Sequence, residues 1–109
     1  MTDTDSITWL MNWYQAQCNE DWEHSFGVLI DTLDNPGWSL TIDLNETALL
    51  GKPFTPVYEN IDPADAMQGL DGDIHWIVAE VKGTKFWAIG GPRDLMRLIE
   101  IFRAWACEP

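Results

Sequence analysis

The turn sequence Asp34–Gly37 is the feature that most constrains how this chain folds. Apolar and polar residues alternate along Trp22–Ile30 before it and along Trp38–Leu44 after it. Alternation with a period of two is typical of β-strands, while Pro fixes φ and Gly accepts a positive φ in a tight turn. The sequence therefore predicts an antiparallel hairpin with Gly37 at positive φ. The core face of its first strand is expected to carry Trp22, His24, Phe26, Val28 and Ile30.

A second hairpin and two helices are also indicated. Segments Ile74–Val81 and Lys85–Ile89 have the composition of strands and are joined by a short turn at residues 82–84. Apolar residues at helical spacing predict an N-terminal helix, capped by Asp5 or Ser6 and ending near Asn19. Its expected core stripe is Ile7, Leu10, Met11, Tyr14 and Cys18, with Trp9 and Trp13 on the far side. A C-terminal helix is expected to begin at Pro92 and to bury Leu95, Leu98, Ile99, Phe102 and Ala106.

These elements predict a single α+β domain over residues 1–109. The expected architecture is an antiparallel sheet of about four strands, formed by the two hairpins, with the N-terminal and C-terminal helices packed on one face. The other face of the sheet is expected to be open. It would carry Leu29, Asp31, Ser39, Thr41 and Asp43.

The charge of the chain limits its partners. Eighteen acidic residues against six basic ones give a net charge of −12, which argues against binding nucleic acid or an anionic membrane. A strongly acidic domain attracts basic proteins instead. No apolar run is long enough to cross a bilayer, and the acidic N-terminus does not resemble a signal peptide. We therefore expect a cytoplasmic protein with a basic protein partner.

The stretch from Cys18 to His24 holds a thiol, an imidazole and three carboxylates, and it allows more than one interpretation. Cys18 could serve as a nucleophile with His24 as its base, in a small cysteine-dependent enzyme of sulfur transfer or hydrolysis. The negative end of a helix and acidic neighbours disfavour a thiolate, so a structural Cys18 is preferred. The spacing of the Cys and His residues does not support a zinc site. No cofactor or metal is predicted.

Several motifs together resemble the Imm53 family of bacterial immunity proteins. They are Trp13-Tyr14, Cys18, Trp22-Glu23-His24, Gly27, Thr32–Trp38, Asp43-Leu44, Gly90-Gly91-Pro92 and the closing helix with Leu95, Ile99, Phe102 and Trp105. The resemblance implies a non-catalytic protein that binds and neutralises a cognate polymorphic toxin domain in the producing bacterium. Residues 56–73 match no family motif and are interpreted as an insertion.

The toxin-binding candidates combine acidic groups with aromatic residues, because aromatic anchors carry much of the energy of protein interfaces. Electrostatic attraction from the carboxylates would speed association with a basic toxin. The candidate residues are Glu20, Asp21, Trp22, Glu23, His24, Asp31, Asp43, Trp9 and Trp13.

Overall fold

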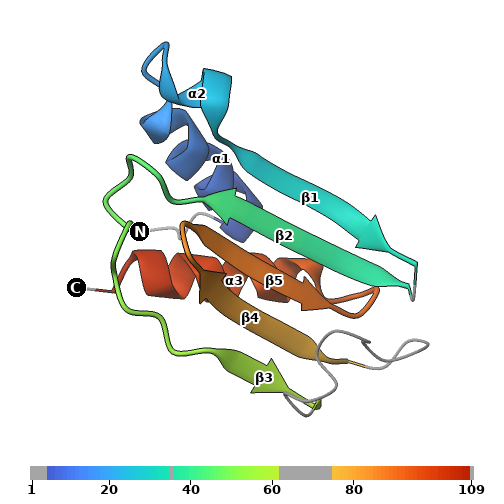
Figure 1. The fold of residues 1–109 in the computed structure, drawn as a ribbon. Coiled ribbons are helices and arrows are strands. Elements are labelled where there is room, and N and C mark those ends of the chain that lie inside the picture. Colours follow the sequence, from blue (N-terminus) through green and yellow to red (C-terminus); the bar gives the residue numbers. More distant parts are fainter. Residues whose placement is uncertain (1–4, 35, 62–74, 109) are drawn as a thin grey trace.

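The computed structural model describes residues 5–34, 36–61 and 75–108, which form three helices and five strands. The elements are α1 (Ser6–Gln17), α2 (Trp22–Ser25), β1 (Val28–Leu33), β2 (Gly37–Asp43), β3 (Val57–Glu59), β4 (Ile77–Lys82), β5 (Lys85–Gly90) and α3 (Leu95–Ala106). The strands make one sheet in the order β1-β2-β5-β4-β3, and all neighbours are antiparallel (Figure 1). The predicted α+β class is confirmed.

Helices α1 and α3 lie on the same face of the sheet, as predicted (Figure 1). The apolar spacing of α3 turns one side of that helix toward the strands, and Phe102 lies at the centre of the core with its ring 5.0 Å from that of Phe86 on β5. Burial of a side chain of this size stabilises the fold by roughly 1.5–3 kcal/mol. The core between the layers includes Leu40, Ile42, Phe86, Ala88, Leu98, Ile99, Phe102 and Trp105.

The buried face of α1 differs from the prediction. Asp5 caps the helix as expected, accepting a hydrogen bond from the Thr8 N–H at 2.7 Å. Trp9 and Trp13, expected on the far side, instead place their rings 5.8 and 5.1 Å from Phe102. Most of the expected core stripe faces solvent, since Ile7, Met11 and Tyr14 are exposed while Leu10 is buried. A large aromatic side chain can bury about 150–250 Å², which favours packing the indole side of α1 against the core.

The predicted strand beginning at Trp22 is wrong at its start. Residues Trp22–Ser25 form the single helical turn α2, and the strand β1 starts only at Val28. The Asn19 side chain accepts hydrogen bonds from the N–H groups of Asp21 and Trp22, at 3.0 and 2.8 Å. Such local side-chain bonds compete with sheet pairing and favour a turn.

The core assignments for this predicted strand hold only in part. Trp22 is buried, and its indole donates to the Asn45 carbonyl oxygen at 2.8 Å. His24 and Ile30 are exposed, and Phe26 and Val28 are half-buried. The strand lies at the edge of the sheet, where one side of each residue lacks a neighbouring strand.

Both predicted hairpins are present, but Gly37 acts differently from the prediction. β1 pairs with β2 from Val28↔Ile42 to Leu33↔Gly37. In the turn between the two strands, the structure describes every residue except residue 35. The φ angle of Gly37 is not positive. A Cβ added there would lie 2.3 Å from the Gly90 carbonyl oxygen, so glycine is required by the close approach of two strands.

Two further boundaries are corrected by the structure. Helix α3 begins at Leu95 rather than at Pro92, because residues 91–94 form a turn closed by a 3.0 Å hydrogen bond from the Asp94 N–H to the Gly91 carbonyl oxygen. Residues 57–59, expected to be irregular, form β3 and pair with β4. The rest of the proposed insertion, residues 62–73, and the expected start of the second hairpin at Ile74 lie outside the described residues.

Candidate protein-binding surface

Charge is distributed unevenly along the chain. Residues 1–51 contain nine of the eighteen acidic residues and no Lys or Arg. All six basic residues follow: Lys52, Lys82, Lys85, Arg93, Arg97 and Arg103. The first 51 residues supply α1, α2, β1 and β2, so the acidic half of the chain occupies one end of the sheet (Figure 1). A basic partner would be attracted to this end.

The junction between α1 and α2 carries the densest group of predicted contact residues. Glu20 and Asp21 are exposed, and Glu20 lies at a positive φ of 74°. Glu23 turns its carboxylate back toward the chain and accepts hydrogen bonds from the N–H groups of Asn19 and Glu20, at 3.0 and 2.9 Å. Backbone hydrogen bonds, first from its own N–H, lower the pKa of Glu23. The junction therefore exposes Glu20 and Asp21 on a turn that the Glu23 carboxylate closes through backbone hydrogen bonds.

The remaining predicted contact residues are dispersed. Asp31 is exposed on β1 and its carboxylate accepts a hydrogen bond from the Thr32 N–H at 2.8 Å. Asp43 is half-buried, accepts from the Gly27 N–H at 3.0 Å and pairs with Lys85 at 3.2 Å. Trp22, only 1% exposed, has no surface to offer a partner, and Trp9 and Trp13 are half-buried against α3.

An apolar groove between α1 and β1 was not predicted. Its volume is about 310 Å³, and it is lined by Leu10, Met11, Tyr14, Gly27, Val28 and Ile30. Met11 is 58% exposed and Ile30 is 41% exposed, values that are high for large apolar side chains in a folded domain. The sequence held one signal for this surface, since α1 is apolar on two sides and only one of them can face the core.

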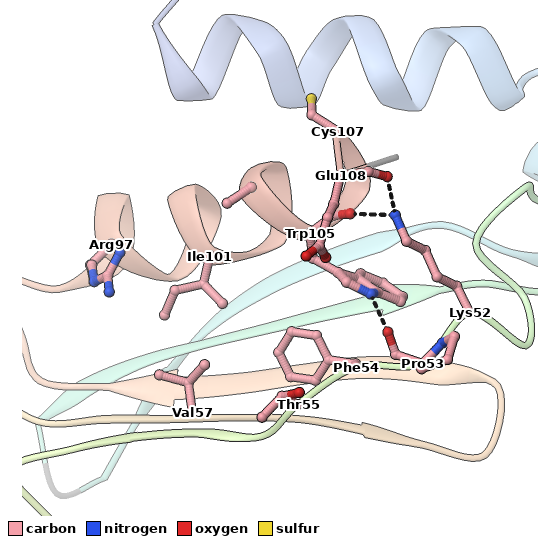
Figure 2. Close-up of a pocket in the computed structure, with 11 residues that line it drawn as sticks. Lys52, Pro53, Phe54, Thr55, Val57, Arg97, Ile101, Trp105, Cys107 and Glu108 are labelled. Carbon is pink, nitrogen blue, oxygen red and sulfur yellow. Dashed lines mark hydrogen bonds between the residues drawn. The ribbon is translucent and has the colours of Figure 1, made fainter.

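A larger, shallow hollow of about 750 Å³ lies between residues 52–57 and the C-terminal half of α3 (Figure 2). The Lys52 ammonium and the Trp105 indole N–H in it already have partners. The Lys52 ammonium donates to the carbonyl oxygens of Trp105 and Glu108 at 2.7 and 2.6 Å, and the Trp105 indole donates to the Pro53 carbonyl oxygen at 2.8 Å. Lys52 thus satisfies carbonyl groups at the C-terminal end of α3, where cations are favoured.

A polar network joins β3, the start of β4 and α3. The two ring nitrogens of His75 lie 2.8 Å from Asp94 and 3.0 Å from Glu59, and Glu59 also pairs with Arg97. The hydrogen bond with Asp94 is the largest cause that raises the pKa of His75. Asp94 is buried and accepts from the N–H groups of Trp76 and Gly91, at 3.2 and 3.1 Å. This arrangement ties β3, the start of β4 and the start of α3 together.

The geometry around Cys18 gives no support to a cysteine nucleophile. Its thiol donates to the Tyr14 carbonyl oxygen at 3.4 Å, whereas His24 is exposed on the following turn and is not a hydrogen-bond partner of Cys18 among the described side chains. In the part of the chain that the structure describes, no group of three or more His, Cys, Asp or Glu residues is placed to hold a metal ion. The described helices include none that is long and apolar enough to span a bilayer.

Comparison with known proteins gives one match. The family model described as immunity protein 53 matches residues 7–107, which is nearly the whole chain. No curated protein and no solved structure matches.

Proposed function

The chain belongs to the immunity protein 53 family, and from this premise we propose that it binds a cognate toxin domain and neutralises it in the cytoplasm of the bacterium that makes both. The observation that carries the proposal is the match over residues 7–107, since it spans the described helices and strands apart from Ser6, the first residue of α1. An immunity protein protects by occupying its toxin. The proposed action is therefore binding, without a chemical step.

The charge distribution supports a basic toxin as the partner. The acidic half of the chain contains no Lys or Arg of its own, and Glu20, Asp21 and Asp31 are exposed on it. Complementary charges act mainly on the association rate, and added salt screens them over a Debye length of about 8 Å at physiological ionic strength. We therefore expect association with the toxin to be fast and to slow as salt is raised.

The alternative function, a small cysteine-dependent enzyme using Cys18 and His24, has no observation in its favour. Such an enzyme needs the nucleophile and base within hydrogen-bond reach and a pocket for substrate. The Cys18 thiol is instead directed to a backbone carbonyl oxygen of its own helix.

Co-expression with the toxin domain encoded beside this gene tests the proposal. The parent chain should restore growth and bind the purified toxin domain in surface plasmon resonance. The double variant Glu20→Lys with Asp21→Lys should associate about tenfold more slowly at low salt, since steering changes rates by 10-fold or more. Asp43 is left intact, because its bonds to Gly27 and Lys85 make it part of the fold.

A matched control makes the same change in charge elsewhere. Glu100 and Glu108 are exposed in the C-terminal half of the chain, and replacing both by Lys should leave association within about twofold of the parent. Equal association rates for the two double variants would exclude the acidic junction as the contact. A parent chain that neither binds the toxin nor protects cells would refute the proposed function itself.

A further inference from the structure

The outer edge of β1 presents free backbone groups. β1 lies at one end of the sheet and pairs only with β2 within the described residues. The Asp43 N–H donates to the Gly27 carbonyl oxygen at 3.1 Å, which marks residues 27 and 43 as a hydrogen-bonded pair. Such pairs alternate along an antiparallel ladder. The constant register therefore directs the N–H and C=O groups of Leu29 and Asp31 toward β2, and those of Val28, Ile30 and Thr32 outward.

Within the described residues, this edge lacks Lys, Pro, a bulge and a covering segment, and Asp31 is the one charged side chain on β1. Natural edge strands are protected by Lys, Pro, bulges or covering segments. β1 has the sequence VLIDTL, without Lys or Pro, and its register with β2 is unbroken. One outward group is occupied, since the Asp31 carboxylate accepts from the Thr32 N–H at 2.8 Å. The outward N–H groups of Val28 and Ile30 have no partner among the described residues.

The apolar groove described above runs along this same edge. Met11 and Tyr14 of α1 form one wall, and Val28 and Ile30 of β1 form the other. Alternate side chains of a strand added to β1 would point toward the helix side and lie in this groove. Main-chain hydrogen bonds and alternate side-chain pockets are the two requirements for recognition by strand addition.

The acidic surroundings of the groove favour a basic segment as its occupant. The helix and the strand that form it come from the segment with nine acidic residues and no basic one. The Tyr14 ring in the wall of the groove packs against the Trp22 ring, with the centroids 6.0 Å apart, and Glu23 follows Trp22 directly in the chain. A second copy of this chain would place two such acidic segments against each other. A segment bearing Lys or Arg would be attracted instead.

We propose that the β1 edge binds an extended segment of the toxin, apolar at alternate positions and flanked by Lys or Arg, as a sixth strand of the sheet. The inference rests on the proposed function, because the partner that it names is the toxin. It adds the contact surface and the backbone geometry of the complex. Neither the acidic junction at Glu20 and Asp21 nor the family match specifies this edge.

Amide hydrogen exchange followed by NMR tests the inference residue by residue. In the free chain, the outward amides of Val28 and Ile30 should exchange rapidly, while the amides of Leu29 and Asp31, bonded to β2, should be protected. In the complex with the purified toxin domain encoded beside this gene, the Val28 and Ile30 amides should slow by about tenfold or more. The Leu29 and Asp31 amides serve as the internal control and should stay protected.

A variant gives an independent measurement. Ile30→Pro removes an outward N–H, which an edge strand tolerates, and should weaken toxin binding by about tenfold, the effect of one lost hydrogen bond. The control Ile30→Val keeps the N–H and an apolar side chain and should bind within about twofold of the parent. The exchange experiment on the parent does not depend on whether Ile30→Pro folds.

The outcomes separate the two proposals. A parent chain that binds the toxin while the Val28 and Ile30 amides exchange as in the free chain would overturn only the strand addition. A parent chain that does not bind the toxin would overturn both proposals. Protection of these two amides in the isolated chain, together with a dimer in sedimentation, would assign the edge to a second copy and would also overturn the inference.

Discussion

Gly37→Ala is the substitution whose effect the structure defines most sharply. The added Cβ would lie 2.3 Å from the Gly90 carbonyl oxygen and 3.1 Å from Leu33 Cδ1. The first neighbour is backbone on β5 and cannot rotate away. Because favourable non-bonded contacts need about 3.5 Å, β2 and β5 would have to separate locally by about 1 Å.

The expected loss of stability follows from this overlap. Overpacking of a well-packed core costs about 1–3 kcal/mol of unfolding free energy. Each kcal/mol lowers Tm by about 4–8 °C in a domain of up to about 100 residues, so Gly37→Ala should melt roughly 5–20 °C below the parent. Thermal unfolding followed by circular dichroism, with urea titration at 25 °C, measures both quantities.

Gly27→Ala is the matched control. A Cβ at Gly27 has no atom within 4 Å, and its φ is not positive, so the substitution should leave Tm unchanged or raise it slightly. Gly37→Asn separates the two explanations for the glycine. Asn tolerates positive φ better than Ala does, so it would be the milder substitution if φ were the reason. Steric overlap predicts that Asn is at least as damaging as Ala. If Gly37→Ala had the same Tm as Gly27→Ala, the proposed steric overlap at Gly37 would be refuted.

Three further substitutions test the polar contacts. Asp94→Ala removes the acceptor of the buried Trp76 N–H and leaves the Gly91 N–H with the Trp76 carbonyl oxygen alone, so it should lower the free energy of unfolding by about 1–3 kcal/mol in urea, with Asp94→Asn intermediate. The pKa of His75 is raised in the folded state, chiefly by the hydrogen bond with Asp94, so its contribution to stability is full below pH 6.5 and is lost as pH rises through the folded pKa. His75→Gln should remove this decline from a urea midpoint series between about pH 5.5 and 9, and a series parallel to that of the parent would contradict the linkage. Lys52→Met removes two hydrogen bonds at the end of α3 and should lower the free energy of unfolding by about 1–3 kcal/mol. The control Lys82→Met loses an exposed ion pair and should lower it by less than about 1 kcal/mol. Equal Tm values for the two variants would show that Lys52 does not cap the helix.

The candidate surface was only partly predictable. The exposure of the Glu20, Asp21 and Asp31 side chains was predictable from their residue type, because Asp and Glu are mostly found at the surface of folded proteins. The sequence left open whether Trp9 and Trp13 are exposed; they pack against the core, and the exposed apolar surface of α1 is the opposite one, with Met11. A helix that is apolar on two sides does not itself specify which side is buried.

The elements that the sequence determined by itself are those with one dominant local signal. Period-two alternation and turn residues specify the two hairpins, and a single apolar stripe specifies α3. Gly37 was identified as a required glycine, although the reason came from another strand. Its neighbour Gly90 is more than fifty positions away in the chain, and no local pattern records that approach.

Tertiary structure decided the features that depend on distant partners. Trp9 and Trp13 pack against Phe102, and this contact determines which face of α1 is buried. Hydrogen bonds to the Asn19 side chain favour a helical turn at residues 22–25. The strand order placed β1 at an edge of the sheet, a position that its own sequence does not specify. Pairing between strands far apart in sequence is set by the whole sheet, so the exposed edge and the groove beside it exist only in the folded chain.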